Sequence, residues 1–381
     1  MELTLTDHIT LLLVFSSLLF AVFVFTVKRN NKISNILIAL FLLLNALEAS
    51  YQFIDYFLFK SFPGLGVTIY NLLFLISPLL YLYILSVIYS DFKIKKKDFL
   101  HFIPLILVTL ILIPRFYLVS LEDKHHFLKG GVLNGAIEIK ISYLLIHIQL
   151  LIYLILSFRT VNKYKQILIE NFANSKLFNY RFLFQLIFIY ALGSIIALIK
   201  NIFYFIGVDI KLYYAQDIVS LINLIFIIWL IFKALQNPEI FKKVDSKLQL
   251  TRSTNISLLD QQKHTSELKN KIEKIEHFMS EKEPFMDSTI SLASLSESLE
   301  METKELSYII NQELRTHFFD FINTHRINKA KELLADTSKK QLTVSEIMYD
   351  VGFNSKSSFF TYFKKVENQT PSQFRKNISP K

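Results

Sequence analysis

Cysteine is absent from this chain of 381 residues. Its absence excludes disulfide frameworks, zinc sites built on thiolates and cysteine nucleophiles. The sequence also lacks a nucleophile with a paired base, a glycine-rich phosphate loop and a spaced group of histidines, so we expect neither an enzyme nor a cofactor. The histidines His125 and His126 are adjacent and lack the helical spacing of metal ligands, and no metal site is predicted.

Apolar residues are abundant: they make up 52% of the chain, 36 residues are Phe, and the mean hydropathy is +0.37. These values argue against a wholly soluble protein. The formal net charge is +10, and residues 1–235 carry most of it, with 20 Lys and Arg against 12 Asp and Glu. Residues 285–381 hold 13 against 12. The positive net charge therefore comes mainly from the apolar residues 1–235, and it does not by itself indicate a nucleic-acid-binding protein.

Seven stretches are long and apolar enough to cross a bilayer as helices, since the hydrocarbon core takes about 20 residues. The first begins without a basic segment and has no small-residue cleavage site after it, so we interpret it as a retained helix and not a signal peptide. The predicted spans are 8–27, 33–57, 67–90, 99–119, 139–158, 182–206 and 214–235.

Basic residues alternate between the predicted loops and indicate the orientation of the spans. The loops after spans one, three and five hold twelve Lys and Arg, whereas the opposite loops hold six. Because cytoplasmic loops carry the basic excess, we expect the N-terminus outside and everything after about residue 236 in the cytoplasm. The odd number of spans agrees with this sidedness. The sequence thus predicts a multi-pass membrane protein whose C-terminal part lies in the cytoplasm.

Polar and charged residues inside the predicted spans are costly and are therefore functional candidates. One interpretation is that they hold the bundle together, through interhelical hydrogen bonds and an ion pair such as Glu48 with Lys200. The other is a ligand pocket open to the outside, because in this orientation all of them fall in the outer half of the bilayer. The residues are Asn45, Glu48, Asp55, Asn71, Lys200, Asn201 and Asp217.

A linker is predicted over residues 236–284, where Asn237 and Pro238 end the last apolar helix. Within it, apolar residues recur at spacings of four, three and four, which favours a short amphipathic helix of two heptads. The stripe either packs on the following domain or forms a weak dimer contact that transmits movement from the membrane, and the sequence leaves both open. The stripe consists of Leu268, Ile272, Ile275 and Met279.

A degenerate repeat fills residues 285–381, and each copy reads as helix, tight turn, helix. The pattern of Leu292, Leu295 and Leu299 recurs 52 residues later in Val344, Ile347 and Val351, and Leu306 and Ile310 recur 53 residues later in Phe359 and Phe363. The second turn is therefore one residue longer. It contains Gly352, which suits a sharp reversal, then Phe353 and the N-cap candidates Asn354 and Ser355. Between the copies, Phe318 to Leu334 reads as one helix of about 26 Å.

The second helix of each copy leaves a polar face once its apolar residues are packed. A face of this kind matches a recognition helix that presents donors and acceptors to the major groove of DNA. An ordinary amphipathic helix would also have a polar face, but its duplication favours the DNA-binding interpretation. The residues are Lys304, Ser307, Tyr308 and Asn311 in the first copy, and Lys356, Ser357, Thr361 and Lys364 in the second.

Residues 285–376 resemble the C-terminal DNA-binding domain of AraC/XylS-type transcription regulators. The resemblance is strongest from Ile347 to Arg375, IMYDVGFNSKSSFFTYFKKVENQTPSQFR. It implies base-facing roles for Lys304, Ser307 and Tyr308 in the first copy and for Lys356, Ser357 and Thr361 in the second. The low net charge of the domain further requires its cations to gather on the DNA side: Lys364, Lys365, Arg375 and Lys376. The chain departs from the family pattern at Met348, Asn368, Glu300 and Arg315, the last three of which replace glycines.

The sequence therefore predicts an all-α protein with a seven-helix transmembrane bundle over residues 1–235, a helical linker over 236–284 and a cytoplasmic double helix-turn-helix domain over 285–381. We expect a membrane-bound transcription regulator whose partners are double-stranded DNA, the lipid bilayer, an unknown ligand and, through the linker stripe, a second copy of the chain. The alternatives are a membrane transporter or enzyme whose DNA-binding tail is autoregulatory, and a receptor whose tail serves only as a protein contact.

Overall fold

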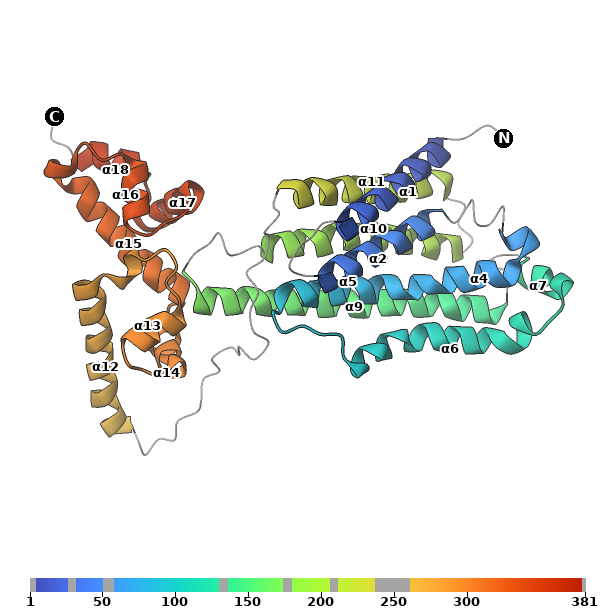
Figure 1. Cartoon of the computed structure of the whole chain (residues 1–381), viewed down its shortest axis with the longest axis horizontal. Coiled ribbons are helices and arrows are strands. Elements are labelled where there is room, and N and C mark those ends of the chain that lie inside the picture. Colours follow the sequence, from blue (N-terminus) through green and yellow to red (C-terminus); the bar gives the residue numbers. More distant parts are fainter. Residues whose placement is uncertain are drawn as a thin grey trace. The chain divides into compact units, whose positions relative to one another are not determined.

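The computed structural model describes residues 5–26, 32–50, 58–129, 136–173, 180–205, 212–236 and 261–378. In these ranges the elements are helices and short helical turns, and Phe172 forms an isolated antiparallel bridge with Ser291. The chain forms two compact units, which we call the N-terminal unit (Met1–Asn162 and Tyr180–Ser246) and the C-terminal unit (Lys163–Asn179 and Lys247–Lys381). The all-α fold class is confirmed for the described residues (Figure 1).

Long apolar helices make up the N-terminal unit. Helix α1 packs against α2 and α11, α2 against α5, and α10 against α11. The elements are α1 (Leu5–Thr26), α2 (Lys32–Ala49), α4 (Pro63–Asn71), η2 (Leu72–Leu75), α5 (Ile76–Ile88), η3 (Lys96–Phe102), α6 (Ile103–Leu112), η4 (Ile113–Tyr117), α7 (Leu121–Leu128), α9 (Ile137–Asn171), α10 (Tyr180–Phe205) and α11 (Leu212–Gln236).

Six helical stretches of the described residues are long and apolar enough to cross a membrane, by length and composition, and each overlaps one of the first six predicted spans. They are Asp7–Thr26, Lys32–Ala49, Pro63–Ile88, Lys96–Tyr117, Ile137–Asn171 and Tyr180–Phe203. The seventh predicted span falls on α11, whose side chains are described from Asp217 to Lys233, and it stays a prediction. Large apolar side chains point out of this unit, Phe15 and Phe188 among them, with 64% and 68% of their surfaces exposed.

Helix α9 differs from its prediction. The sequence pattern ends span five at residue 158 and places a basic loop after it, but the helix continues without a break to Asn171 and has 35 residues. The basic and polar residues that follow Phe158 are helical because none of them is a helix breaker and because the helix keeps a buried face there, with Val161, Tyr164 and Leu168 inaccessible to solvent. Helix α9 thus begins in the N-terminal unit and ends in the C-terminal unit.

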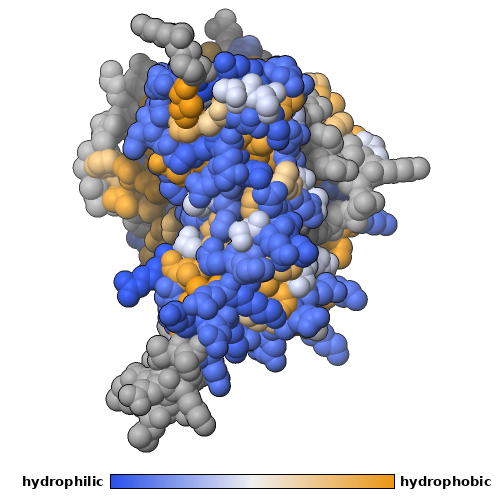
Figure 2. Space-filling model, turned by 90° about the vertical axis from the view of Figure 1, so that its left-hand side faces the viewer, coloured by the Kyte–Doolittle hydropathy of each residue, from blue (hydrophilic) through white to orange (hydrophobic). Residues whose placement is uncertain are grey.

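The C-terminal unit is a polar-surfaced helical domain. Its elements are α12 (Gln261–Lys282), η6 (Pro284–Met286), α13 (Leu292–Ser298), α14 (Thr303–Tyr308), η7 (Ile309–Glu313), α15 (Phe318–Ala335), η8 (Thr337–Lys339), α16 (Val344–Asp350), α17 (Lys356–Glu367) and α18 (Pro371–Ile378). Figure 2 shows a face on which hydrophilic residues predominate. In the described part of this unit, the large apolar side chains that are exposed are Tyr349 and Ile378, in contrast to the N-terminal unit.

The apolar stripe of α12 packs on this domain. Ile275 and Met279 are completely buried in one core with residues of α13, α14 and α15, and Leu268 and Ile272 lie against the same core. The structure therefore favours the first of the two roles left open for the stripe, in which it covers the following domain. The same four residues are not an exposed seam for a second copy of the chain.

The predicted duplication is present as two helix-turn-helix motifs joined by α15. The first motif is α13 with α14 and η7, and the second is α16 with α17. Helix α15 was expected over 17 residues and has 18. Its N-terminal half contributes Phe318 and Ile322 to the core of the first motif, and its C-terminal half contributes Ile327 and Leu334 to the core of the second. One rigid helix therefore carries both motifs.

Candidate DNA-binding interface

The turn of the second motif has the geometry that its sequence predicts. Gly352 has a φ of +89°, and a Cβ at this position would lie 2.6 Å from the backbone oxygen of Met286. A side chain is thus excluded both by conformation and by space. Ser355 caps α17 by accepting a hydrogen bond from the amide of Ser358 at 3.4 Å, and of the two cap candidates it is the one that takes this role.

Helix α17 presents a continuous polar face. Its apolar residues Phe359 and Phe363 are fully buried in the core of the second motif. The four residues of this helix that the sequence assigns to DNA are all exposed: Lys356, Ser357, Thr361 and Lys364. The last three follow one another at spacings of four and three residues, which places them on one side of the helix. The Lys356 ammonium lies 5.6 Å from the centroid of the Phe360 ring, which orients this cation at the first turn of the helix.

Two of the cations assigned to the DNA side have protein partners instead. The Nζ of Lys365 donates to Asp320 Oδ1 at 2.8 Å and lies over the ring of Tyr362, although its side chain remains 63% exposed. Arg375 folds back and donates from Nη1 to the backbone oxygen of Leu342 at 2.7 Å, while its Nε and Nη2 are buried. This guanidinium joins α18 to the segment before α16, and the assignment of Arg375 to the DNA side stays a prediction.

The recognition face of the first motif is smaller than predicted. Lys304 is exposed and Tyr308 is half-buried, but Ser307 is only 4% exposed and accepts a hydrogen bond from Asn311 Nδ2 at 3.1 Å. The helix widens into a π turn after Tyr308, and the side chain of Asn311 folds back onto Ser307 and donates from Nδ2 to its backbone oxygen at 2.9 Å. Asn311 lies 3.2 Å from His317 and holds the chain entering α15. The assignment of Ser307 to an exposed face is wrong.

Three residues at which the chain departs from the glycines of the family pattern adopt the left-handed conformation. Glu300 has a φ of 50°, Arg315 of 51° and Asn368 of 56°. Asn tolerates this region better than Glu or Arg. The backbone geometry of the glycine-containing pattern is therefore preserved in both motifs, at some cost in strain at Glu300 and Arg315.

Arg326 is the residue that connects the two motifs, and its fully buried role was not predicted. It is 1% exposed and donates from Nε to the oxygen of Phe285 at 2.6 Å and from Nη2 to the oxygen of Asp287 at 2.8 Å. Burial lowers the pKa of Arg326 to about 10, so the guanidinium stays charged at neutral pH. An arginine in the middle of an amphipathic helix resembles a surface residue by its chemistry, which is why the sequence alone does not reveal this position.

Polar residues of the N-terminal unit also meet, on four helices. Glu48 of α2 and Lys200 of α10 interact electrostatically, and so do Lys200 and His147 of α9. The Nδ2 of Asn201 lies 3.2 Å from His147 Nε2. The hydroxyl of Tyr190 interacts with Glu48 and lies 3.4 Å from Ser77 Oγ of α5. We call these residues the polar cluster; sequence reasoning missed Tyr190 and Ser77 because neither is unusual in an apolar helix.

The remaining pocket candidates are placed as follows. Asn45 donates to the oxygen of Phe41 in its own helix at 2.7 Å. Asn71 is buried at the end of α4, and its Nδ2 has no hydrogen-bond partner among the described residues. Asp217 is half-buried on α11, and Asp55 lies outside the described residues. Within the described parts of the chain, no group of three or more His, Asp and Glu residues is close enough to hold a metal ion.

The similarity to known proteins is concentrated in the C-terminal unit. Residues 295–377 match a family described as a helix-turn-helix domain. An uncharacterised HTH-type transcriptional regulator of Staphylococcus aureus strain COL is 37% identical over 86 residues, which are 23% of this chain and 11% of that protein. The arabinose operon regulatory protein of Escherichia coli K12 is 28% identical over 95 residues, which are 25% of this chain and 32% of that protein.

A solved structure gives a match of the same extent. It is the C-terminal domain of the two-component response regulator yesN from Fusobacterium nucleatum, with 35% identity, a TM-score of 0.25, and coverage of 28% of this chain and 98% of that one. The chain spans about a tenth of the length of the S. aureus relative and about a third of that of the E. coli relative. Residues 295–377 of this chain are an AraC-type helix-turn-helix domain.

Proposed function

We propose that this protein is a membrane-bound, sequence-specific transcription regulator. Its N-terminal unit crosses a bacterial cytoplasmic membrane seven times and senses a signal, and its AraC-type domain binds double-stranded promoter DNA on the cytoplasmic side. The observation that carries the proposal is the exposed polar face of α17 in the second motif. Its residues Lys356, Ser357, Thr361 and Lys364 are solvent-exposed, whereas Phe359 and Phe363 hold the helix on the domain.

The dimensions of α17 suit this role. Twelve residues form a helix about 18 Å long, and the major groove, about 12 Å wide, admits an α-helix. Thr361 offers a hydroxyl and a methyl group to base edges, while Lys356 and Lys364 carry charge toward the phosphates on either side. The first motif supplies fewer contacts, from Lys304 and Tyr308, so base reading is concentrated in the second motif.

Helix α15 supports reading of two sites on one duplex. Its 18 residues span about 27 Å and carry one motif at each end. Successive major grooves on one face of DNA are about 34 Å apart. A single chain with two motifs on one rigid spacer therefore contacts two neighbouring grooves, in the way that two-fold dimers do with two chains.

The membrane assignment rests on three properties of the chain. Six described helices are apolar over a length that crosses a bilayer, large apolar side chains cover the outside of the N-terminal unit, and the basic residues alternate between its loops. The polar cluster, which joins Glu48, His147 and Lys200, is the part of this unit that is chemically equipped to respond to a ligand.

DNA binding is tested with the full chain in lipid nanodiscs. The chain is incubated with a random library of double-stranded DNA, and bound molecules are amplified and sequenced over several rounds. We expect a recurring site with two elements about one helical turn apart. Recovery of unselected sequence only, at low salt as well as at physiological salt, would refute sequence-specific binding.

Matched variants separate the specific contribution of α17 to DNA binding from the effect of net positive charge. Lys356→Ala with Thr361→Ala removes two groups from the exposed face and should abolish enrichment of the element read by the second motif. Lys269→Ala removes an exposed lysine from α12 and should leave the recovered site unchanged. Equal loss in both proteins would mean that only net charge matters.

Localisation and orientation are tested by reporter fusions in a bacterial host. A fusion after Asn237 should report the cytoplasm and a fusion near His126 the outside. The opposite pattern, or full-length protein recovered in the soluble fraction without detergent, would contradict the proposed membrane topology.

A further inference from the structure

Helix α9 is longer than a membrane span requires. Its 35 residues extend over about 52 Å, whereas the hydrocarbon core of a bilayer is about 30 Å thick. About 15 residues therefore lie beyond the apolar layer, and this overhang includes Arg159, Lys163 and Lys165. The helix ends at Asn171, and the two residues after it belong to the C-terminal unit.

Those two residues, Phe172 and Ala173, dock on the helix-turn-helix domain. Phe172 forms an antiparallel bridge with Ser291, the residue that caps α13 of the first motif. Ala173 is 1% exposed and is part of the core to which α13, α14 and α15 contribute. Asn323 of α15 donates from Nδ2 to the oxygen of Ala173 at 3.1 Å, in a buried hydrogen bond between residues 150 positions apart.

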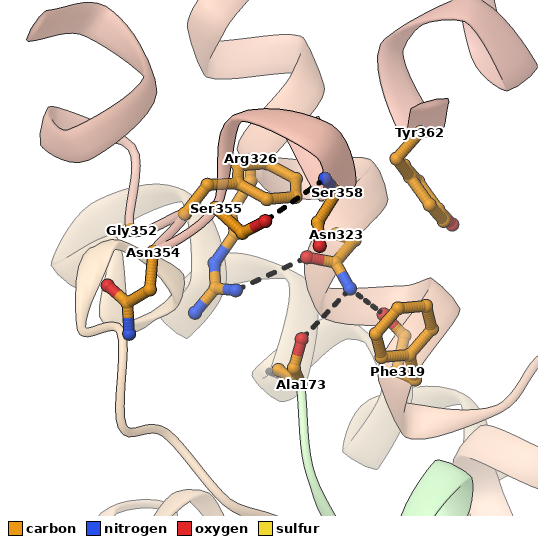
Figure 3. Close-up of a pocket in the computed structure, with 10 residues that line it drawn as sticks. Ala173, Phe319, Asn323, Arg326, Gly352, Asn354, Ser355, Ser358 and Tyr362 are labelled. Carbon is orange, nitrogen blue, oxygen red and sulfur yellow. Dashed lines mark hydrogen bonds between the residues drawn. The ribbon is translucent and has the colours of Figure 1, made fainter. Parts of the chain in front are cut away.

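Asn323 relays this contact toward the second motif. Its Oδ1 accepts a hydrogen bond from Arg326 Nη1 at 3.2 Å, and the Arg326 guanidinium lies 5.5 Å from the centroid of the Phe353 ring in the second turn. A small pocket follows the same path. Figure 3 shows Ala173, Asn323 and Arg326 at the pocket wall, together with Ser355 and Ser358 at the start of α17.

We propose that the Phe172–Ala173 segment is the contact through which the N-terminal unit acts on DNA binding. When the segment is docked, it completes the first motif and holds Asn323 and Arg326 in place, which fixes the arrangement of the two motifs on α15. A signal that shifts α9 weakens this contact and loosens the joint. The proposal rests on the proposed DNA-binding function and names its regulation.

The expected direction follows from preorganisation. A domain whose two motifs are already held in one arrangement loses less conformational entropy when it binds two DNA elements. Undocking should therefore weaken binding to the two-element site. Binding to a half-site that only the second motif reads should not change, because α17 keeps its own core.

The docking itself is tested by crosslinking in the membrane-embedded full chain. The natural sequence has no cysteine, so Phe172→Cys with Ser291→Cys introduces a single pair. Paired residues of antiparallel strands have Cα atoms about 4.5 to 5.5 Å apart, a range that a disulfide spans. We expect a reducible crosslink within one chain in most molecules. The control pair Phe172→Cys with Ser338→Cys should not crosslink, because Ser338 lies past the far end of α15, at least about 18 Å from Asn323 along the helix.

The consequence for DNA is measured with the site recovered by the wild-type chain. Ala173→Asp places an unpaired carboxylate in the core and should lower affinity for the two-element site by about fivefold or more, with less than a twofold change on the half-site. Ala173→Gly keeps the backbone carbonyl that Asn323 binds and should behave as the wild type. The oxidised Phe172→Cys, Ser291→Cys pair should keep wild-type affinity for both DNAs.

The outcomes separate the two proposals. Unchanged two-element affinity in Ala173→Asp, equal losses on both DNAs, or an absent crosslink in the Ser291 pair overturns the docking role. If Ala173→Asp unfolds the domain, the Phe172→Cys, Ser291→Cys pair decides the matter. A destabilising signal should lower affinity for the two-element site in the reduced pair, in which the segment can undock, and should leave it unchanged in the oxidised pair. If the wild-type chain selects no DNA site, the regulator function fails, while the crosslink still reports on the docking.

Discussion

The guanidinium of Arg326 lies 5.5 Å from the centroid of the Phe353 ring, so a buried cation of the spacer helix α15 contacts the turn of the second motif. The same side chain binds two backbone oxygens of the segment after α12. The connection between the two motifs therefore consists of specific polar contacts, which lie between the apolar cores of the two motifs.

Replacement of Arg326 should destabilise the C-terminal unit strongly. Arg326→Met leaves the buried oxygen of Phe285 without its Arg326 donor and the oxygen of Asp287 with only the amide of Ile290, which we expect to cost about 3 kcal/mol. Hydrogen exchange of α16 and α17 in the full chain measures the loss. Arg315→Met, at an exposed position of the same domain, should change stability by less than about 0.5 kcal/mol. Equal protection in both variants would contradict the role of Arg326.

Glycine should stabilise the turn of the first motif. Glu300 has a φ of 50°, which costs a residue with a side chain about 1 kcal/mol, so Glu300→Gly should raise the free energy of unfolding by a similar amount. Glu297→Gly, three residues earlier inside α13, should lower it by about 1 kcal/mol. Urea unfolding followed by exchange of α13 amides compares the two, and a loss of stability in Glu300→Gly would disprove the strain.

The two polar residues Thr361 and Arg375 should separate base reading from stability. Thr361→Ala should change the preferred base at one position of the selected site by about 1 to 3 kcal/mol while leaving stability unaltered. Arg375→Ala should leave the preferred bases unchanged and lower stability, because this guanidinium binds the oxygen of Leu342. Sequencing of selected DNA and thermal unfolding give the two readouts. An altered base preference in Arg375→Ala would return this residue to the interface.

Acid should weaken the C-terminal unit through His325. Burial between Phe285 and Phe321 lowers the pKa of His325, while Glu276 partly opposes the shift. The unfolded chain therefore takes up the proton first, so stability is fully present above about pH 6.5 and falls as the pH drops below this value. Urea midpoints at pH 7.5 and pH 5.5 should show this loss, and His325→Phe should reduce it. An identical loss in the variant would assign the pH dependence to other groups.

The charge of Glu48 should matter for signalling and not for DNA affinity. Glu48→Gln removes the negative partner of Lys200 in the polar cluster, which should alter promoter output in cells that express the full chain. Affinity for the selected site in nanodiscs without signal should change by less than twofold. Asn45→Ala, on the same helix but bonded within it, serves as the control. Unaltered output under every signal tried would remove the polar cluster from sensing.

Local patterns in the sequence predict the duplicated motifs well. The repeat of apolar positions identifies both helix pairs, and Gly352 and Ser355 have the turn and cap roles expected of them. Helix α15 differs from its predicted length by one residue. These features depend on spacing and on the conformational preferences of single residues, which the sequence carries directly.

Partners that are distant in sequence are what the patterns cannot supply. The side chain of Asn311 bonds to Ser307 and lies beside His317, and the bond of Arg375 to the backbone oxygen of Leu342 engages a cation that the sequence assigns to the DNA side. Composition also predicts too early an end for α9, because the polar residues after Phe158 are typical of a loop. The contact of Ala173 with Asn323 has no local signal at all, since one partner is a backbone oxygen.

The C-terminal unit is discontinuous along the chain, because Phe172 and Ala173 are synthesised about 90 residues before α12 and complete its first motif. A protease that cut once after α11 would release α12 to α18 without these two residues. In the freed fragment, Ser291 would lack its bridge partner Phe172. If the chain is the membrane-bound regulator proposed above, a single cut would not release a complete DNA-binding domain, and the promoter would have to come to the membrane.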